Sequence, residues 1–489
     1  MKQTTIAIAT LVLLALVAAP AHAAPRDRAI LDTLTSELAR AKSGLKLEEF
    51  DPPYFISYTL KVQEQHIIKG SSGGIYYSSP SSSSDLAVQV RIGSYEFDNT
   101  NPEEPDLFPP YPYGDEFERV WALLHAPLGS DEASLFALRR RLWLLSDIIY
   151  KQALSEYMDK KAKKVRILQT EQIPNFSREE PQVYIEPQGS FDFKPSLWER
   201  VVRDEGLYLA SFPEIRKNDI SVKATRIRRY FVNTEGTRIA DSHELFVFHA
   251  QVQALADDGM PVENFFTRYS RSLDDLPTPK EIHRGIEEMV KETLALIKAP
   301  TIEPYTGPAL LDASVCAVFF HEAIGHRLEG ERQRSHEEGQ TFAKKLGERI
   351  VPEFISVIDD PTLRRWENGD YLNGYYLYDD EGVKAQRVVL VEDGILKGFL
   401  LSRTPIKGFL HSNGHGRAAS YLKPVARMAN TIVLSKKQRP WDELKQMLIE
   451  MAKEKGKPFG LIIKKARWGE TYTRRRWIQA FRNHPILIY

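Results

Sequence analysis

The chain has 489 residues, of which 42% are hydrophobic, so it is long enough to bury a large core and to form more than one domain. Its 66 Lys and Arg residues balance its 66 Asp and Glu residues, so bulk charge gives no attraction to nucleic acid. A single cysteine, Cys316, excludes an internal disulfide. We therefore expect a large globular protein with no nucleic-acid partner.

The N-terminus has the pattern of a secretory signal peptide. Lys2 precedes an unbroken apolar run over residues 6–19, and Ala21-His22-Ala23 follows as an A-x-A cleavage site. The run is shorter than the roughly 20 residues that a membrane-spanning helix needs, which disfavours a membrane anchor. We expect residues 1–23 to be removed and the mature protein to be periplasmic or extracellular, with no membrane attachment after cleavage.

The first part of the mature chain alternates helical and extended patterns. A helix is expected over about 29–41. Residues 69–85 are rich in Gly and Ser and predict a flexible loop, whereas the alternation over 86–97 predicts a strand. Ser130 or Asp131 then caps a long helix with apolar residues at three- and four-residue steps.

Residues 221–259 predict paired strands, with turn residues in the stretch NTEGTRI. The next helix starts clearly, because Thr278 and Glu281 form a capping box around a proline at the first helical position. A proline-flanked connector follows this helix. We place a domain boundary there, between an N-terminal α+β domain, residues 24–298, and a C-terminal domain, residues 299–489.

The C-terminal part opens with a short strand and then a helix, within residues 309–326. The Asp393-Gly394 pair between two apolar runs predicts a hairpin with a tight turn. An amphipathic helix closed by Gly456 follows. Helices and strands alternate without a βαβ period, so the expected fold class is α+β.

The stretch HEAIGH places His321, Glu322 and His326 together. A zinc helix usually has two histidines four residues apart, but here the step is five. In a regular helix a five-residue step separates two side chains by about 140°, against about 40° for a four-residue step. Gly325 tolerates a distorted backbone, so we expect a π-bulge to return both imidazoles to one face.

Two imidazoles are suitable zinc ligands, and a catalytic zinc keeps one position for water. Glu322, adjacent to a ligand, is the candidate general base that would take the proton of that water during peptide hydrolysis. The alternative is chance, since two histidines near one glutamate occur by chance in many chains of this length. The apolar run over 315–320 favours the metal, because buried polar groups need partners.

Other polar residues have two interpretations each. Glu329 is a ligand or a hydrogen-bond partner of a histidine, or else an ordinary exposed carboxylate. His411 and His415 lie in a glycine-rich stretch and are expected to be solvated rather than to approach the metal. His336 is expected at the surface, and Cys316 in the core.

Two charged stretches are also interpreted as structural. The cluster Asp379-Asp380-Glu381 is expected to be a surface turn rather than a metal or acid-base site. The basic stretch over 464–477 interleaves Arg with Trp and Tyr, and we expect a solvated sheet face rather than a nucleic-acid site.

The motif and its downstream blocks together resemble a known family. HEAIGHRLEG (321–330), VIDDPTL (357–363), YDDEGVKAQRVVLVEDGILKGFLLSR (378–403) and NGHGRAASYLKPVARMANT (413–431) occur in the order found in the TldD/PmbA proteins, also called modulators of DNA gyrase. These proteins are zinc metallopeptidases. A looser resemblance extends the match to roughly residues 29–431.

The resemblance implies an N-terminal α+β domain and a β-rich C-terminal domain that carries the metal-site helix. It implies cleavage of unfolded or short peptides in a homodimer or a heterodimer with a paralogue. His321 and His326 would be zinc ligands and Glu322 the base. Arg417 and Tyr421 match a block near the cleft, where they would hold a peptide carboxylate and stabilise an oxyanion; the alternative is packing.

One part of the family pattern is missing. The family's third zinc ligand is a cysteine near the C-terminal end, and no cysteine follows Cys316 here. The sequence thus leaves the third ligand open, and we expect either a chain shortened relative to the family or a divergent member of it. Three functions follow: an active zinc peptidase; a catalytically inactive subunit that binds peptides or supports an active paralogue; or an exported solute-binding protein without a metal. Peptide specificity is open in each.

Overall fold

We describe the protein from a computed structural model. It describes residues 25–47, 49–102, 115–129, 131–164, 173–335, 340–420, 422–472 and 480–488. The predicted signal peptide, His336 and Tyr421 lie outside these residues. Within these ranges, no helix combines the length and the apolar character needed to cross a membrane.

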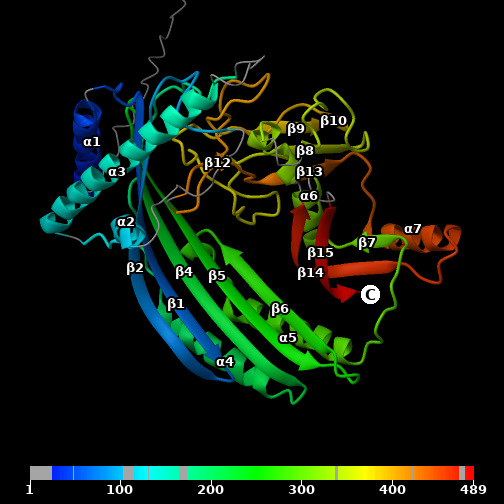
Figure 1. Ribbon diagram of the computed structural model, residues 1–489. Helices are drawn as coiled ribbons and strands as arrows, with labels where there is room; N and C mark the ends of the chain where they lie inside the picture. The colour runs from blue at the N-terminus through cyan, green and yellow to red at the C-terminus, as the bar shows by residue number, and fades with distance from the viewer. Residues whose placement is uncertain are drawn as a thin grey trace, which may run out of the picture.

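The N-terminal part is built on one long curved sheet (Figure 1). The strand order is β2-β1-β4-β5-β3, and β6 also pairs with β5. Neighbouring strands are antiparallel except for β3, which runs parallel to β5. The strands are β1 (Phe55–Ser71), β2 (Gly74–Arg91), β3 (Val183–Ile185), β4 (Ile215–Asn233), β5 (Arg238–Leu255) and β6 (Pro261–Ser270).

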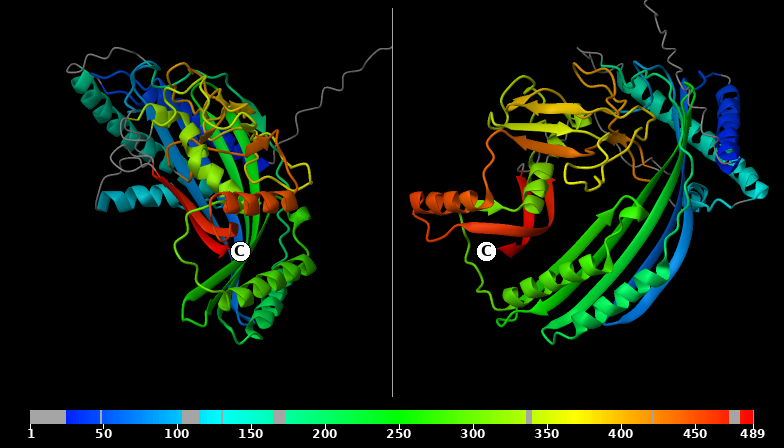
Figure 2. Two further views of the ribbon diagram at one scale, coloured as in Figure 1. Left: turned by 90° about the vertical axis from the view of Figure 1, so that its right-hand side faces the viewer. Right: turned by 180° about the vertical axis from the view of Figure 1, so that it is seen from behind.

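Helices cover one face of this sheet, and the period of two along each strand determines which residues they bury. At one end, Tyr58, Leu60 and Tyr230 pack against α1 and α3, and at the other end Val222 and Phe248 pack against α4 and α5. Figure 2 shows α4 and α5 lying along the sheet. The helices are α1 (Pro25–Gly44), α2 (Asp115–His125), α3 (Glu132–Lys164), α4 (Pro195–Ala210) and α5 (Pro279–Ile297).

Several predicted elements are confirmed. The capping box of α5 forms, with the Thr278 hydroxyl accepting from the Glu281 backbone and the Glu281 side chain accepting from the Thr278 backbone. Asp131 caps α3, since its Oδ1 accepts from the Ser134 N–H at 2.9 Å. The hairpin expected over 221–259 is β4 and β5. These features depend on local sequence, which is why the sequence predicts them.

The predicted flexible loop over 69–85 is wrong. Residues 55–91 form one long hairpin, turning at Ser72 and Gly73, whose φ values of 50° and 80° are those of a tight left-handed turn. Strand β2 lies at the edge of the sheet, so Pro80, which has no N–H, breaks no ladder on the open side. The long strand β1 supplies the pairing that the Gly and Ser composition does not predict.

The C-terminal part contains small sheets and few helices, in agreement with a β-rich expectation. β10-β9-β8-β13 form one sheet, β15-β14-β7 a second, and β11-β12 a ribbon. The elements are β7 (Ala309–Leu311), α6 (Ala313–Ala323), β8 (Ile355–Asp359), β9 (Val388–Glu392), β10 (Ile395–Leu396), β11 (Gly416–Arg417), β12 (Val425–Ala426), β13 (Thr431–Ser435), α7 (Trp441–Glu454), β14 (Leu461–Tyr472) and β15 (Ala480–Ile488), with short 3-10 turns at Leu273–Asp275, Gly325–Leu328 and Gly330–Gln333.

Two local predictions for this part are confirmed. Asp393 and Gly394 turn the β9-β10 hairpin with φ values of 49° and 81°. Gly456 follows α7 in a left-handed conformation, with φ of 61°. The described elements together form an α+β fold.

The predicted surface turn at Asp379-Asp380-Glu381 is wrong, because all three side chains are buried. They lie where the C-terminal part meets the sheet face opposite the helices. Arg229 of β4 joins Asp241, at 2.9 Å, to Asp380, at 3.3 Å, and Lys61 of β1 lies 3.1 Å from Asp380. This buried network fastens the C-terminal part to the N-terminal sheet, a role that local sequence does not indicate.

Burial acts differently on the three carboxyls. It opposes ionisation of Asp380, but Arg417, Lys61 and Arg229 outweigh it and hold the pKa of that carboxyl below its usual range. Burial raises the pKa of Asp379 and of Glu381; the charge of Asp380 raises that of Asp379 further, and the charge of Asp379 raises that of Glu381. The junction therefore contains one firmly ionised carboxylate and two that resist ionisation.

Candidate metal centre

The two histidines lie at the C-terminal end of α6. The helix starts from β7, which pairs in parallel with β14, and the Asp312 carboxylate accepts from the Ala313 N–H at 2.6 Å at its N-terminus. Helix α6 packs against β14 (Figure 1). The C-terminal end of a helix carries partial negative charge, which favours a cation bound there.

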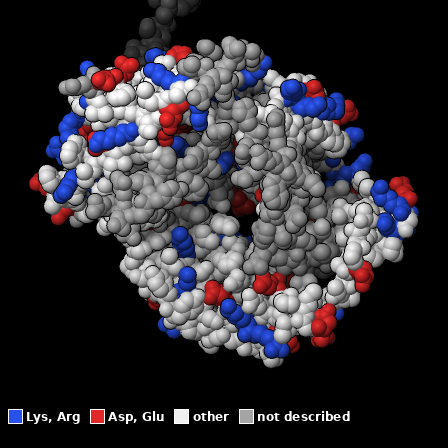
Figure 3. Space-filling model, viewed as in Figure 1, with Lys and Arg blue, Asp and Glu red and all other residues white. Residues whose placement is uncertain are grey.

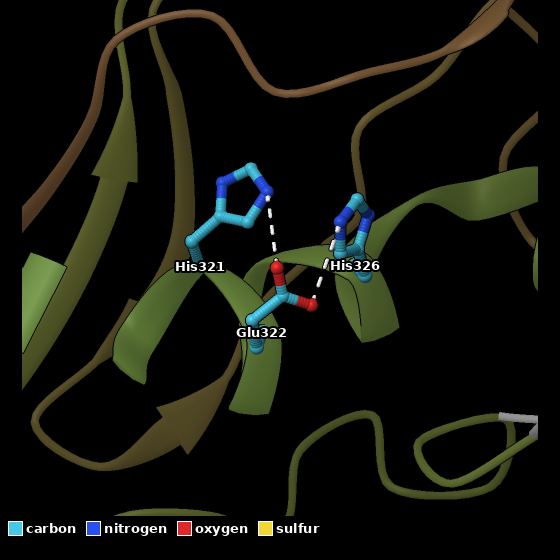
Figure 4. Close-up of side chains that lie close together, drawn as sticks. All are labelled: His321, Glu322 and His326. Carbon is cyan, nitrogen blue, oxygen red and sulfur yellow. Dashed lines mark ion pairs between the residues drawn. The ribbon is translucent and has the colours of Figure 1, made fainter. Parts of the chain in front are cut away.

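His321, Glu322 and His326 form a compact group (Figure 4). Glu322 is 7% exposed and lies between the imidazoles, with its two carboxylate oxygens 3.8 Å from His321 Nε2 and 3.9 Å from His326 Nε2. The ring centroids of the histidines are 4.6 Å apart, and one ligand atom from each of the three residues lies within 4.8 Å of the others. One ion could contact all three residues at this spacing.

The predicted π-bulge is wrong, since the helix ends instead. Helix α6 stops at Ala323, and a 3-10 turn over Gly325–Leu328 swings His326 back beside His321. Arg327 stabilises the break by donating to the carbonyls of Glu322 and Ala323, at 2.7 and 2.9 Å. The change from an α-helix to a 3-10 turn thus brings together two histidines that are five residues apart.

Gly325 has a different role from the expected one. Its backbone is not in the left-handed region, but a Cβ atom there would overlap the side chain of Met428. The glycine therefore allows close packing between the 3-10 turn and the segment that follows β12, and a larger residue would require the Met428 side chain to move.

Glu329 orients His326. Its carboxylate lies 2.9 Å from His326 Nδ1 and also accepts from Arg332, at 2.7 Å, and Arg427, at 2.9 Å. An ionised carboxylate only accepts, so the proton is on Nδ1 and the Nε2 lone pair is free to bind a metal. Burial disfavours the Glu329 charge, but these donors outweigh it and lower its pKa. The side chain is 1% exposed and is not an ordinary exposed carboxylate.

His321 is suited to be the outer ligand. Its side chain is half exposed, and burial of the remainder, together with nearby His326, lowers its pKa. A neutral imidazole is the form that binds zinc. The chemistry of the donor set, two imidazole nitrogens and a carboxylate at a cation-favouring helix end, therefore fits zinc.

No other His, Cys, Asp or Glu among the described residues joins this group. Cys316 is half-buried rather than in the core, and burial raises the pKa of its thiol, which disfavours the thiolate that a metal needs. Among the described residues, Glu322 is therefore the third member of the group.

The structure separates the remaining candidates from the histidine pair. His415, expected to be solvated, is fully buried and lies 3.2 Å from Asp359, which ties β8 to the loop before β11. His411 is exposed, as expected. Arg417 pairs with Asp380 at 3.1 Å and stacks on Tyr376, so it belongs to the junction between the two parts of the chain.

Arg332 and Arg427, which donate hydrogen bonds to Glu329, were not identified from the sequence. Arg332 lies three residues after Glu329, so this contact could have been predicted from the spacing. Arg427 is 98 residues away, and nothing in the local sequence indicates the contact.

Comparisons with known proteins show similarity to metalloproteases. Residues 304–465 match a family model described as the PmbA/TldA metallopeptidase C-terminal domain. A metalloprotease of Methanocaldococcus jannaschii is 36% identical over 187 residues, which is 38% of either chain. A metalloprotease of Methanothermobacter thermautotrophicus is 34% identical over 285 residues, 57% of either chain. A zinc metalloprotease TldD homologue of Saccharolobus solfataricus is 30% identical over 177 residues, 36% of this chain and 37% of that one.

Solved structures show a similar fold over most of the chain. TldE from Thermococcus kodakarensis superposes with a TM-score of 0.56 at 14% identity, covering 89% of this chain and 83% of that one. A protein described as a putative modulator of a DNA gyrase, from Thermotoga maritima, gives 0.55 at 15% identity, covering 93% and 90%. The sequence matches above cover less than two thirds of each curated relative.

Proposed function

We propose that the chain is a zinc-dependent peptidase of the TldD/PmbA family, because its C-terminal part matches that family's model and similar proteins are named metalloproteases. His321 and His326 hold the metal, and Glu322 is the general base. The observation that carries this proposal is the convergence of both Nε2 atoms on the carboxylate of Glu322, at 3.8 and 3.9 Å.

Zinc, when bound, supplies a Lewis acid that acidifies water and polarises a peptide carbonyl. Each residue of the chain has a separate task. Glu329 holds the Nδ1 proton of His326 and so keeps Nε2 available. A carboxylate oxygen of Glu322 receives the proton of the attacking water and later passes it to the leaving amine.

Substrate, partner and location are parts of the same proposal. We expect short or unfolded peptides as substrates, since an extended chain can approach the half-exposed face of His321. We expect a homodimer or a heterodimer with a paralogue, which would also offer a route to a third metal ligand. The signal-peptide pattern of residues 1–23 supports export to the periplasm or beyond.

The test distinguishes two roles of Glu322, a general base and a metal ligand. Zinc per chain and peptide cleavage would be measured in the mature protein and in the variants His321→Ala, His326→Ala and Glu322→Gln. We expect about one zinc per chain in the parent and little in either histidine variant, because two-histidine sites lose most affinity with one imidazole. Glu322→Gln should keep the metal and lose at least about 100-fold in rate, the range of general-base catalysis.

Loss of zinc in Glu322→Gln would instead make Glu322 the third ligand and remove it as the base. The matched control is Glu353→Gln, which alters a glutamate that is 72% exposed and lies on the loop before β8. A parent protein that binds no zinc would contradict the peptidase.

One observation favours a second candidate, a catalytically inactive subunit that binds peptides beside an active paralogue. The described residues offer two imidazoles and one carboxylate, so a three-residue metal site would use the only available base. Peptide binding that is unchanged in His321→Ala, without zinc or cleavage in the parent, would support the inactive subunit.

A further inference from the structure

The edge of the N-terminal sheet has a gap on the side of β5 away from β4. β3 pairs with β5 only as far as Ala240, and β6 begins to pair with it at Phe246. Residues 241–245 therefore have no strand partner on that side within the described chain. A cavity of about 250 Å³ occupies the gap, between residues 184–189, the start of the segment after β6 and residues 364–377 of the C-terminal part.

Three carboxylates line this cavity, and each is already engaged by an arginine of β4. Asp241 accepts from Arg229 and Glu244 from Arg226, the latter at 2.7 Å. Glu186 accepts from the backbone N–H and hydroxyl of Ser242, at 2.7 and 3.0 Å, and lies 3.8 Å from Arg228. An arginine therefore offsets part of the negative charge of each carboxylate.

Two arginines of the lining have no such partner. Arg271 donates to the Asn373 carbonyl, at 2.5 Å, and to His243 Nδ1, at 3.3 Å, both of which are uncharged acceptors. Arg364 lies over the rings of Tyr371 and Tyr375, at 5.4 and 5.7 Å. Neither forms an ion pair with a carboxylate of the described chain.

Two other guanidinium groups act on Arg271. Burial lowers its pKa, and Arg417 and Arg364 lower it further, while Tyr375 and Glu244 oppose this shift. Arg417 stacks on Tyr376, another residue of the lining, and its buried Nη1 has no hydrogen-bond partner in the described structure. An anion placed between Arg271 and Arg364 would relieve their mutual repulsion.

We propose that this cavity is a carboxylate-binding site in which Arg271 and Arg364 hold the carboxylate and the tyrosines contact an apolar substituent. The planar guanidinium fork matches a carboxylate in geometry. The acidic groups in the lining favour a single negative charge over a phosphate dianion. The tyrosine rings of residues 184, 371 and 375 suit an aromatic or aliphatic group.

The volume limits the ligand. At about 250 Å³ the cavity is smaller than the roughly 300–1,000 Å³ of pockets for drug-sized ligands. A small organic acid or the last residue of a peptide is therefore the appropriate size. The residues of this site do not include the histidine pair, and the site does not depend on a bound metal. The carboxylate site can therefore be tested independently of the proposed peptidase activity.

The first measurement is calorimetric titration of the mature protein with 3-phenylpropionate, and with 3-phenylpropionamide as the uncharged match. We expect the acid to bind and the amide to bind at least about tenfold more weakly, since charge-assisted hydrogen bonds are lost. Arg271→Gln and Arg364→Gln should each weaken the acid by about tenfold or more. Equal binding of acid and amide, or unchanged binding in both variants, would overturn the proposal.

Arg365→Gln is the matched control. Arg365 is adjacent to Arg364 and lies 3.7 Å from the Tyr371 ring centroid, but it pairs with Asp275 at 2.7 Å and does not line the cavity. The Arg365→Gln variant should bind the acid as tightly as the parent protein does. Arg271→Lys keeps the charge and guards against a folding defect, so it should bind the acid better than Arg271→Gln.

Two further titrants define the ligand class. Inorganic phosphate that binds as tightly as the acid would overturn the selectivity for a carboxylate. N-acetyl-glycylphenylalanine compared with its C-terminal amide distinguishes the source: a preference for the acid form supports capture of a peptide C-terminus. If the dipeptide does not bind but 3-phenylpropionate does, the ligand of the two arginines is a free organic acid.

Discussion

The Nδ1 atom of His326 lies 2.9 Å from the carboxylate of Glu329, which is 1% exposed and is held by arginines from two different segments. This contact fixes the tautomer of His326. Replacement of Glu329 by Gln would let the amide accept the same hydrogen bond but remove the charge that raises the basicity of the imidazole. We expect zinc affinity to fall by about 10- to 100-fold.

Competition with a chelator would measure this loss, with Glu353→Gln as the control. The folded state should persist, because Gln keeps the volume of the side chain. Zinc affinity equal to that of the parent would show that Glu329 has no influence on the metal and serves only to neutralise Arg332 and Arg427.

Gly325→Ala tests the packing of the 3-10 turn. The new Cβ would overlap the side chain of Met428. Overpacking of this kind costs about 1–3 kcal/mol, so the midpoint of thermal unfolding should fall. Met428→Ala in the same chain should restore part of the loss, because the shorter side chain vacates that space.

The control for this prediction is Gly189→Ala, where a Cβ would have no neighbour within 4 Å. The unfolding midpoint of that variant should stay close to the parent value. If Gly325→Ala is equally harmless, the turn can shift away from Met428 without cost and the glycine is not required for packing.

The surface of the molecule shows why bulk composition predicts little about these sites. Acidic and basic side chains are interspersed on the face seen in Figure 3, and the surface there is hollowed between the sheet and the C-terminal part. The balance of charge known from the sequence holds for the whole chain. The arrangement of individual charges within the cavity and the junction depends on the fold.

Features that a few neighbouring residues determine were predictable. The α5 cap needs only Thr278 and Glu281, and the histidine group lies within six residues of sequence. The β1-β2 hairpin was not predictable, because serine-rich β2 owes its extended form to pairing with β1. Burial of His415 and of Asp379–Glu381 likewise depends on partners more than 20 residues away, such as Asp359 and Arg229.

Glu331→Gln tests whether a buried carboxyl group in the C-terminal part destabilises the folded protein as the pH rises. Burial raises the pKa of Glu331 to about 7, while the Ser402 hydroxyl and the Ala426 N–H donate to the carboxylate and limit the rise. The folded state binds more protons than the unfolded state between the ordinary carboxyl pKa and about 7. The contribution of Glu331 to stability therefore falls as the pH rises through this window.

Glutamine has no charge to bury, so Glu331→Gln should stabilise the protein relative to the parent more at pH 8 than at pH 5. Urea unfolding at both pH values measures the difference, and the exposed control Glu353→Gln should show none. A difference between variant and parent that is independent of pH would mean that Glu331 ionises in the folded state as readily as in water.

Arg229→Gln tests the junction between the two parts of the chain. Arg229 is 1% exposed and donates to Asp241, Asp380 and the carbonyls of Tyr378 and Asp379. Its removal leaves the buried Asp241 without its cation, whereas Asp380 keeps Lys61 and Arg417. Breaking a buried pair in this way costs about 3–5 kcal/mol. We expect a large loss in the free energy of unfolding by urea.

The matched control is Arg365→Gln, which removes an exposed arginine whose pair with Asp275 lies at the surface, where such pairs contribute about 0–1 kcal/mol. A second substitution tests the cause of the loss: Asp241→Asn in the Arg229→Gln background removes the carboxylate that has lost its cation and should recover part of the stability. No recovery would mean that the lost contacts to Asp380 and to the carbonyls of Tyr378 and Asp379, rather than the charge of Asp241, account for the loss.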